Sequence, residues 1–329
     1  MQSNTVKQQH PVRLRAPLLG ILLAITICLL TPYNNIYLRA TPLGGGHFPL
    51  APFFVFLLLT ILTGLVAKLF SSIRLFSGTE LLVIWIQMVV GSGIAYTGFA
   101  RTFLINLTTP FHFATAGNRW KETLHPLIPA SLVPKDLSAI EQLYNGLPGG
   151  RDMGWFTVIR TLPWSAWISP LLQWGSFILL CFLIMLFLIN IISRQWIHNE
   201  RMNFPLLKVP EMMAESVNRG EVSSLFSNRY LIAGLSVPIV LHLVNGLNLY
   251  YPSIPSIPTL MLAGPYFSDS GILTGFHKLK LYFYPAFIGF AFLTSRQISF
   301  SFWFFFLAGC LFYGLLNIAG YSIPHSRPS

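Results

Sequence analysis

Hydrophobic residues along this chain form long runs that are separated by short polar stretches. The hydrocarbon core of a bilayer is about 30 Å thick, and a helix needs about 20 apolar residues to cross it. By that length the pattern predicts seven transmembrane spans, at residues 17–36, 49–70, 80–106, 166–192, 229–249, 281–295 and 298–319. Only Ser295, Arg296 and Gln297 separate the last two, which predicts a tight hairpin. The predicted fold class is all-α, a polytopic transmembrane helical bundle of about seven spans with re-entrant or broken segments.

The first expected break lies between the first two spans, at residues 31–50. Pro32, Pro42 and Pro49 forbid a continuous helix there. Residues 44–46 are glycines, which adopt backbone conformations that other residues avoid. Irregular backbone at membrane depth is tolerated only where protein or a water-filled cavity satisfies its polar groups. Two interpretations stay open, an ordinary outer turn and a re-entrant stretch that lines a cavity.

The third span contains the second expected break. It is too long for one perpendicular crossing, and residues 91–93 (Gly-Ser-Gly) interrupt it. Glu80 and Gln87 are seven positions apart and therefore share one helical face. An acidic residue so close to hydrocarbon is a candidate for ion or proton coupling. The alternative is that Glu80 caps the helix N-terminus, where unpaired N–H groups favour a carboxylate.

The polar segments complete the predicted domain organisation. Its parts are a cytoplasmic tail (1–16), spans 1–3 (17–107), an extracytoplasmic polar region (108–165), span 4 (166–192), a cytoplasmic loop with an amphipathic helix (193–228), spans 5–7 (229–319) and a C-terminal tail (320–329). The polar region is too small to bury much of a core alone. We expect it to cap the membrane part, with one short helix from Asp136 to Leu143.

The cytoplasmic loop follows the longest apolar run. Pro205 and Pro210 are expected to end helices in it. Residues 209–225 are amphipathic and are expected to lie on the inner leaflet.

Composition and charge support a membrane location. The chain is 53% hydrophobic and only 9% charged, whereas about a quarter of residues are charged in soluble domains. The net charge of +11 comes from Lys and Arg scattered between apolar runs, so the expected partner is the lipid bilayer and no nucleic acid. Counting Lys and Arg in the short loops predicts a multi-pass protein of the cell inner (plasma) membrane with a cytoplasmic N-terminus. The odd span number then predicts an external C-terminus.

The common enzyme and nucleotide-binding signatures are missing from the sequence, including GxxxxGK[ST], GxGxxG, HExxH and GxSxG. The spacing of His112, Glu122, His125 and Asp136 matches no metal-ligand pattern. We therefore expect no enzyme activity, no catalytic residues, no cofactor and no metal site. Discontinuous helices with a few polar residues are instead typical of transporters.

Six pieces of the chain carry a resemblance to a known family. They are residues 31–50 (TPYNNIYLRATPLGGGHFPL), 77–98, 117–136, 162–175, 194–212 (RQWIHNERMNFPLLKVPEM) and 288–305. On these pieces the chain resembles an uncharacterised bacterial family of integral membrane proteins, of the DUF6785/DUF6784 type, related to the oligopeptide transporter superfamily. The resemblance implies a polytopic, transporter-like protein. It also implies that this chain is the N-terminal half. Two alternatives then stay open, a second membrane chain that supplies the C-terminal half and a fragment of a longer protein.

These observations lead to the hypothesis of an N-terminal half of a secondary transporter for small peptide-like or chelate substrates. The expected substrate-binding residues are Asn34, Asn35, Thr41, Gly44, Gly45 and Gly46. The expected coupling or gating residues are Glu80, Gln87, Glu200 and Arg201. The alternative is a non-transporting membrane scaffold or assembly subunit that binds a partner through residues 108–164. An enzyme acting on a lipid-linked substrate is disfavoured because nothing spaces Asp136, Glu141 and Asp152 for catalysis.

Overall fold

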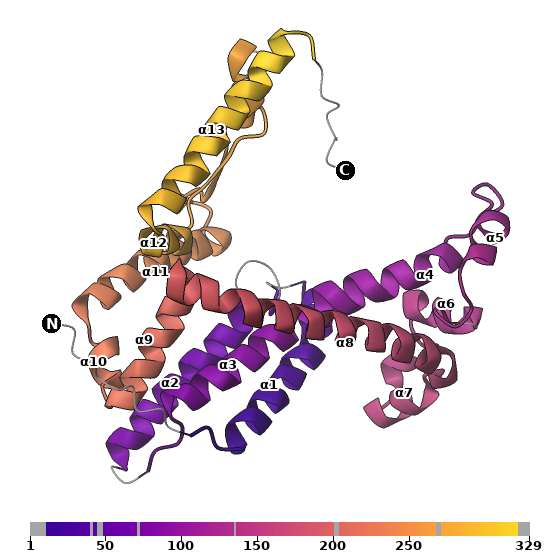
Figure 1. Cartoon of the computed structure of the whole chain (residues 1–329), viewed down its shortest axis with the longest axis horizontal. Helices are drawn as coiled ribbons and strands as arrows, with labels where there is room; N and C mark the ends of the chain where they lie inside the picture. The colour runs from indigo at the N-terminus through magenta and orange to yellow at the C-terminus, as the bar shows by residue number, and fades with distance from the viewer. Residues whose placement is uncertain are drawn as a thin grey trace. The chain divides into compact units, whose positions relative to one another are not determined.

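A computed structural model describes most of the chain, and Figure 1 follows it by colour. It describes residues 11–39, 42–44, 49–70, 73–134, 136–200, 204–267 and 271–321, with only the backbone at 36, 95–97, 100 and 101. The chain divides into two compact units. The first comprises Met1–Leu59 and Thr79–Met202, and the second comprises Thr60–Gly78 and Asn203–Ser329.

Helices make up almost all of the regular structure of the first unit. Its elements are α1 (Arg15–Pro32), the π-helical segment η1 (Tyr33–Tyr37), the first half of α2 (Leu50–Leu69), α3 (Gly78–Gly93), the π-helical segment η2 (Ile94–Phe103), α4 (Leu104–His112), α5 (Trp120–Thr123), η3 (His125–Leu127), α6 (Leu137–Asn145), η4 (Gly150–Asp152), α7 (Trp155–Thr161), α8 (Trp164–Arg194) and the π-helical segment η5 (Gln195–Asn199). The segments η3 and η4 are short 3₁₀ turns.

The second unit is also mainly helical. It contains the end of α2, then α9 (Pro205–Arg219), α10 (Val222–Phe226), α11 (Arg229–Tyr250), β1 (Leu260–Leu262), the 3₁₀ segments η6 (Gly264–Phe267) and η7 (Gly271–Phe276), β2 (Lys280–Tyr282), α12 (Pro285–Leu293) and α13 (Arg296–Ile318). The two strands form one antiparallel hairpin. Since every other regular element in the described residues is helical, the all-α fold class is confirmed.

Five helices in the described part of the chain are long and apolar enough to cross a membrane. They are Arg15–Asn35, Leu50–Leu69, Trp164–Asn199, Arg229–Tyr250 and Arg296–Ile318. They agree with predicted spans 1, 2, 4, 5 and 7, because the thickness of the bilayer sets their length directly. The count of seven is not confirmed.

The sixth predicted span, residues 281–295, is wrong. Lys280–Tyr282 is a strand, and α12 has only 9 residues, which at about 1.5 Å per residue reaches less than half-way across a bilayer. Only Thr294 and Ser295 separate α12 from α13, so the chain does turn sharply there. This is not a hairpin of two spans. The expected external C-terminus rested on seven crossings, a count that is not confirmed, so it stays a prediction.

The third predicted span changes helix type where a break was expected. Helix α3 ends at Gly93, and η2 continues directly into α4, so residues 78–112 form one helical path. In η2 the backbone hydrogen bonds skip one more residue than in an α-helix, and the Leu104 N–H donates to the carbonyl of Phe99. The polar backbone groups are thus satisfied without an open loop in hydrocarbon.

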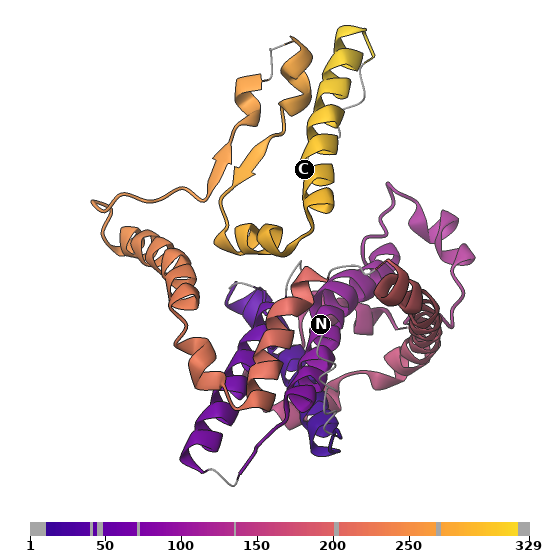
Figure 2. The same ribbon diagram turned by 60° about the vertical axis from the view of Figure 1, so that its left-hand side comes forward.

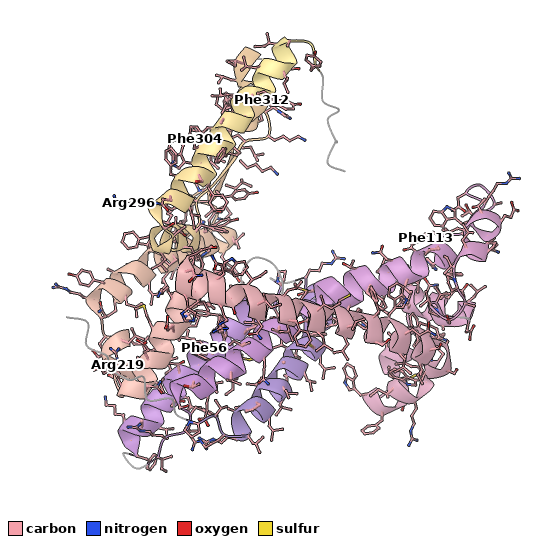
Figure 3. All side chains as sticks on the ribbon, in the orientation of Figure 1. Phe56, Phe113, Arg219, Arg296, Phe304 and Phe312 are labelled. Carbon is pink, nitrogen blue, oxygen red and sulfur yellow. The ribbon has the colours of Figure 1, made fainter. Side chains whose placement is uncertain are left out.

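The core of the first unit lies between α1, the first half of α2 and α3. Phe56, Leu81, Ile84 and Met88 are fully buried there. The Phe56 ring, labelled in Figure 3, packs against Trp85 at 5.9 Å between ring centroids.

A hairpin of two short strands and two 3₁₀ segments lies beside α13 in the second unit (Figure 2). It comprises β1, η6, η7 and β2, and the sequence reading missed it. Gly275 in η7 and Gly314 in α13 allow these two segments to approach each other closely. A Cβ on either glycine would overlap the backbone of the other segment. The Asn317 Nδ2 group also donates to the Thr274 hydroxyl at 3.2 Å.

Helix α9 corrects the expectation for the two prolines. Pro205 is the first residue of α9, where its missing N–H costs nothing. Pro210 lies inside the helix and is buried, so it does not end it. The α9 face that carries Met213 and Ala214 is also buried. A Cβ on Gly78 would overlap the Ala214 carbonyl, so protein rather than lipid covers that part of the amphipathic helix.

Candidate substrate cavities beside a helix interruption

Helices α1 and α3 approach each other closely through small residues. Gly20, Ala24 and Cys28 follow one another at intervals of one helical turn on α1. A Cβ on Gly20 would lie 3.1 Å from the Ile84 Cα and would overlap the Gln87 amide, and one on Gly91 would lie 3.0 Å from the Ala24 Cβ. Such stripes of small residues let membrane helices pack at backbone contact. These contacts fix α1 against α3 over the turns that precede the start of η2.

An ion pair fixes the opposite end of the same two helices. Glu80 lies in the first turn of α3 and is fully buried. The Arg13 side chain donates to both of its carboxylate oxygens, from Nε at 2.8 Å and from Nη2 at 3.0 Å. The Arg13 backbone N–H donates at 3.2 Å, and Arg15 Nη2 lies 3.8 Å away. Hydrogen bonding to Glu80 raises the pKa of Arg13. The structure therefore adds a third role for Glu80, as the anchor of the segment that precedes α1.

The two segments predicted as broken come together at the other end of this helix pair. Gly44 is buried against Ser92, since a Cβ on Gly44 would lie 2.7 Å from the Ser92 carbonyl oxygen. The Cys28 thiol donates to the carbonyl of Gly91 at 3.4 Å. Each helix becomes π-helical close to this contact, α1 in η1 and α3 in η2. Long π-helical segments are rare and occur frequently at functional sites.

Two predicted polar residues of η1 and α3 have buried groups without a hydrogen-bond partner in the described part of the chain. One is Asn35 Nδ2 and the other is Gln87 Oε1. The Asn35 side chain accepts a hydrogen bond from Asn34 Nδ2 at 2.8 Å, so its oxygen is satisfied while its nitrogen is not. A buried polar group without a partner is costly, and in a membrane protein it is a candidate contact for a bound polar molecule.

A cavity lies along one face of η2 and α4. We call it the η2 cavity, and its volume is about 460 Å³. Its lining residues are Gly98, Thr102, Phe103, Asn106, Leu107 and Pro110 from η2 and α4, Ile128, Leu132 and Val133 from the polar region, and Trp174 from α8. Thr102 and Asn106 supply the polar side chains. Trp174 Nε1 donates to the Leu132 carbonyl at 2.9 Å, which fixes the indole as a wall.

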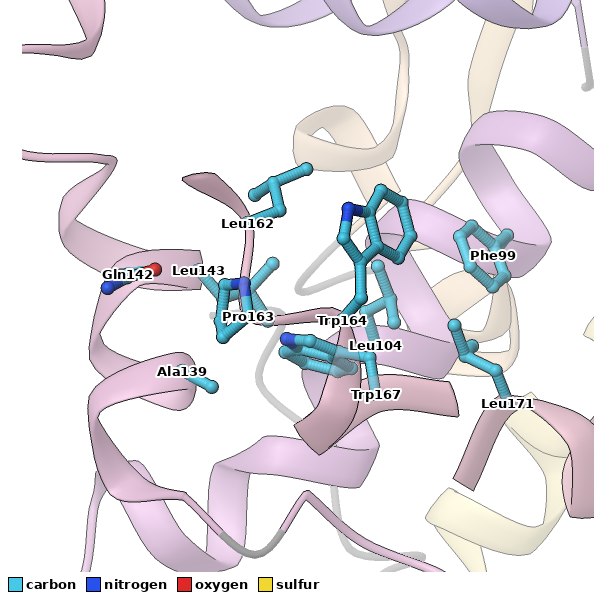
Figure 4. A pocket seen from close by; sticks show the side chains of 10 residues that line it. All are labelled: Phe99, Leu104, Ala139, Gln142, Leu143, Leu162, Pro163, Trp164, Trp167 and Leu171. Carbon is cyan, nitrogen blue, oxygen red and sulfur yellow. The ribbon is translucent and has the colours of Figure 1, made fainter. Parts of the chain in front are cut away.

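A second cavity, of about 310 Å³, lies on another face of the same helix (Figure 4). We call it the aromatic cavity. Phe99, Trp164 and Trp167 contribute rings to it, and Leu104 and Leu171 contribute aliphatic side chains. Gln142 is its polar lining residue, and the Gln142 Oε1 atom is buried without a partner among the described residues. The cavity therefore suits an apolar group that carries one hydrogen-bond donor.

The polar region is attached to α4 by side-chain contacts. The His112 ring stacks on Tyr144 with ring centroids 3.8 Å apart, and the Tyr144 hydroxyl lies 3.0 Å from the buried Thr108 hydroxyl. His125 Nε2 lies 2.8 Å from the Pro110 carbonyl oxygen. The short helix predicted from Asp136 is α6, and Asp136 caps it by accepting from the Ser138 N–H at 2.8 Å. These contacts hold Gln142 at the aromatic cavity and Leu132 at the η2 cavity.

The residues considered for a metal site do not assemble into one. His112 and His125 make the contacts above, and Glu122 pairs with Arg119 at 3.5 Å. In the part of the chain that is described, no three His, Cys, Asp or Glu residues are close enough together to hold a metal ion.

The predicted site residues that the structure describes do not line these two cavities. Asn34, Asn35, Gly44, Glu80 and Gln87 belong to the α1–α3 pair, and none of them is a lining residue of either cavity. Glu200 follows η5 and accepts a long hydrogen bond of 3.4 Å from Gln195 at an exposed position. Thr41, Gly45, Gly46 and Arg201 lie outside the described residues.

The sequence reading missed the polar residues that line the cavities. The signal for the η2 cavity was present, because Gly98, Thr102, Asn106 and Pro110 recur at every fourth position. That spacing places them on one helical face. No comparable signal identified Gln142, since its neighbours across the cavity come from distant parts of the chain.

Five apolar helices of spanning length in the described part of the chain define a helical membrane protein. The chain belongs to a family of unknown function, DUF6785, whose family model matches residues 6–329. No curated protein and no solved structure matches it. The family part of the resemblance is thus confirmed. These comparisons give no support to a relation with oligopeptide transporters or to an N-terminal half.

Proposed function

We propose that this protein takes part in the secondary transport of small peptide-like or chelate solutes and is not an enzyme. The observation that carries the proposal is the η2 cavity beside a helix that changes type within an apolar region. Transporters place their binding sites at discontinuous helices, and the change from α-helix to π-helix in η2 is the corresponding feature of this chain. In this proposal the solute binds first in the η2 cavity and then reaches the α1–α3 pair.

The size and chemistry of the cavity support this solute class. A volume of about 460 Å³ falls within the range of roughly 300–1,000 Å³ that is typical of small-molecule sites. The lining is mainly apolar, with the Thr102 hydroxyl and the Asn106 amide as polar contacts. An amide both donates and accepts hydrogen bonds, so it matches a peptide group or the carbonyl and carboxylate groups of a chelator.

The other parts of the proposal rest on the sequence. An inner-membrane location with a cytoplasmic N-terminus follows from the distribution of Lys and Arg. The relation to oligopeptide transporters, and a second membrane chain that completes the transporter, follow from the resemblance. Asn34 and Asn35 remain proposed solute contacts, with Glu80 and Gln87 as proposed coupling groups and Glu200 as a proposed inner gate.

Uptake into proteoliposomes tests the proposal. The protein is reconstituted as isolated from membranes, with any second membrane chain that co-purifies, and supplied with labelled dialanine, trialanine or ferric citrate. We expect uptake of at least one probe. Asn106→Ala and Thr102→Val are expected to lower it about tenfold, because each removes a hydrogen bond to the solute that is worth about 1.5 kcal/mol. Asn35→Ala is expected to lower it as well.

The matched control is Asn145→Ala, which removes the same amide from an exposed position at the end of α6 that lines neither cavity. This variant should transport at the wild-type rate. No uptake of any probe, or equal rates for Asn106→Ala and wild type, would contradict the proposed function.

One observation favours the scaffold as a second candidate. Trp155 and Phe156 at the start of α7 are 85% and 84% exposed, and large aromatic residues are enriched at protein interfaces. They lie in the polar region that the scaffold would use. The same liposomes distinguish the two functions, because a scaffold has no transport activity.

A further inference from the structure

The second unit contains a cavity that neither the family nor the proposed transport function explains. We call it the basic cavity, and its volume is about 430 Å³. Its lining residues are Thr63, Gly64, Ala67 and Lys68 from α2, Arg74 and Phe76 from the segment after α2, and Val217, Gly220, Val222 and Ser223 from α9, α10 and their junction. All ten belong to the same compact unit.

Close packing forms this cavity and makes it a fixed feature of the unit. A Cβ on Gly64 would lie 2.6 Å from a methyl carbon of Val222, so α2 touches the start of α10 directly. The Gly78 N–H donates to the Asn218 side-chain oxygen at 2.7 Å, which attaches the end of residues 73–78 to α9. Gly220 has a φ of 72° and ends α9 with its N–H bonded to the carbonyls of Ser216 and Val217. These contacts hold Lys68 and Arg74 beside α9 and α10.

The two cations of the cavity have no carboxylate partner among the described residues. Lys68 and Arg74 line it, and neither forms an ion pair within the part of the chain that is described. Two other basic residues of the same unit do have carboxylate partners. Lys208 lies 3.7 Å from Glu211, and Arg219 lies 3.4 Å from Glu215. Glu221 lies between the lining residues Gly220 and Val222 in the sequence but does not itself line the cavity.

The lining is divided between polar and apolar residues in a way that fits an amphipathic anion. Ser223 adds an exposed hydroxyl to the two cations, while Phe76 and Val222 supply a buried apolar surface. A free inorganic anion has no use for the apolar part. A phospholipid uses both, with its phosphate at the cations and the upper part of its acyl chains on the hydrophobic surface.

The position of Lys68 agrees with this occupant. Lys68 lies in the last turn of α2, an apolar helix of spanning length. The end of such a helix lies at the depth of lipid headgroups, and basic pockets at that depth bind anionic headgroups. We propose that the basic cavity binds the headgroup phosphate of an anionic phospholipid. The proposal does not depend on transport.

Lipid titration tests the assignment. Purified protein in uncharged detergent is titrated with phosphatidylglycerol, with phosphatidylcholine as the uncharged reference and inorganic phosphate as a separate arm, while the melting temperature is recorded. Phosphatidylglycerol is expected to raise the melting temperature of the wild type, and phosphatidylcholine and phosphate are expected to have little effect. A ligand that binds only the folded state raises its stability with concentration.

Variants assign the effect to this cavity. Lys68→Gln and Arg74→Gln together are expected to weaken phosphatidylglycerol binding about thirty-fold, since each basic residue near an anionic lipid contributes about 1 kcal/mol. Lys208→Gln is the matched control, because Lys208 is exposed, belongs to the same unit and does not line the cavity. It should bind like the wild type.

The proposal would be overturned by any of three results. They are equal binding of phosphatidylglycerol by the double variant and the wild type, equal loss in Lys208→Gln, or full stabilisation by inorganic phosphate alone. Lys68 and Arg74 are exposed, so the double variant should fold. An unchanged melting temperature in phosphatidylcholine checks that it does.

Discussion

Replacing Gly20 by leucine is expected to separate α1 from α3 and to prevent purification of a folded protein. Gly20 is buried, with the Ile84 backbone directly opposite, so no side-chain movement alone makes room for leucine. Gly20→Ala meets mainly the flexible end of Gln87, and overpacking of that kind typically costs about 1–3 kcal/mol. The measurement is size-exclusion chromatography followed by thermal unfolding.

The matched control for this prediction is Gly175→Leu. Gly175 lies in the apolar helix α8, and an added Cβ there meets nothing within 4 Å. This variant should elute and melt like the wild type. If Gly20→Leu does so too, α1 and α3 are not in backbone contact.

Removing Arg13 is expected to destabilise the protein more than removing the charge of its partner Glu80. Arg13→Gln removes both side-chain hydrogen bonds that Arg13 donates to the fully buried carboxylate, and breaking the pairing of a buried charge is strongly destabilising. Glu80→Gln leaves an arginine whose side chain is 51% exposed and can be hydrated. We expect Arg13→Gln to lower the melting temperature by about 5 °C or more, Glu80→Gln by less, and the double variant by less than Arg13→Gln.

A surface ion pair provides the control for this series. The side chains of Arg119 and Glu122 are 73% and 71% exposed, and such pairs contribute about 0–1 kcal/mol. Arg119→Gln should therefore leave the melting temperature nearly unchanged. Equal melting temperatures for Arg13→Gln and Arg119→Gln would show that the Glu80 carboxylate has no need of Arg13.

The long apolar helices were predictable because their length is a local property of the sequence. Helices α2 and α13 each contain enough consecutive apolar residues to cross a bilayer, and no distant residue decides that. Residues 281–295 have the same composition, yet their first part pairs with Leu260–Leu262 as a strand. Apolar composition alone cannot distinguish a span from a hairpin that packs on one. Aromatic residues such as Phe304 and Phe312, which project from α13 in Figure 3, obscure the difference further.

The candidate site was predictable only in part, for a related reason. Gly91, Ser92 and Gly93 marked the place where the third helix changes type, since glycine weakens an α-helix locally. The Arg13–Glu80 pair joins residues 67 positions apart, and the η2 cavity brings Asn106 next to Leu132 and Trp174. Local pattern shows which residue faces a given side of its helix, but not which distant residue lies opposite.

Thiol labelling of the η2 cavity tests the central claim most directly, because a solute cavity must be open to water. In a background with Cys28, Cys181 and Cys310 replaced by alanine, Asn106→Cys is compared with Leu179→Cys in intact cells, using a membrane-impermeant maleimide. Leu179 lies on α8 and is 61% exposed within an apolar helix of spanning length, so lipid should surround it. We predict rapid labelling of Asn106→Cys and none of Leu179→Cys. An unreactive Asn106→Cys, in a variant that is inserted normally, would contradict the account.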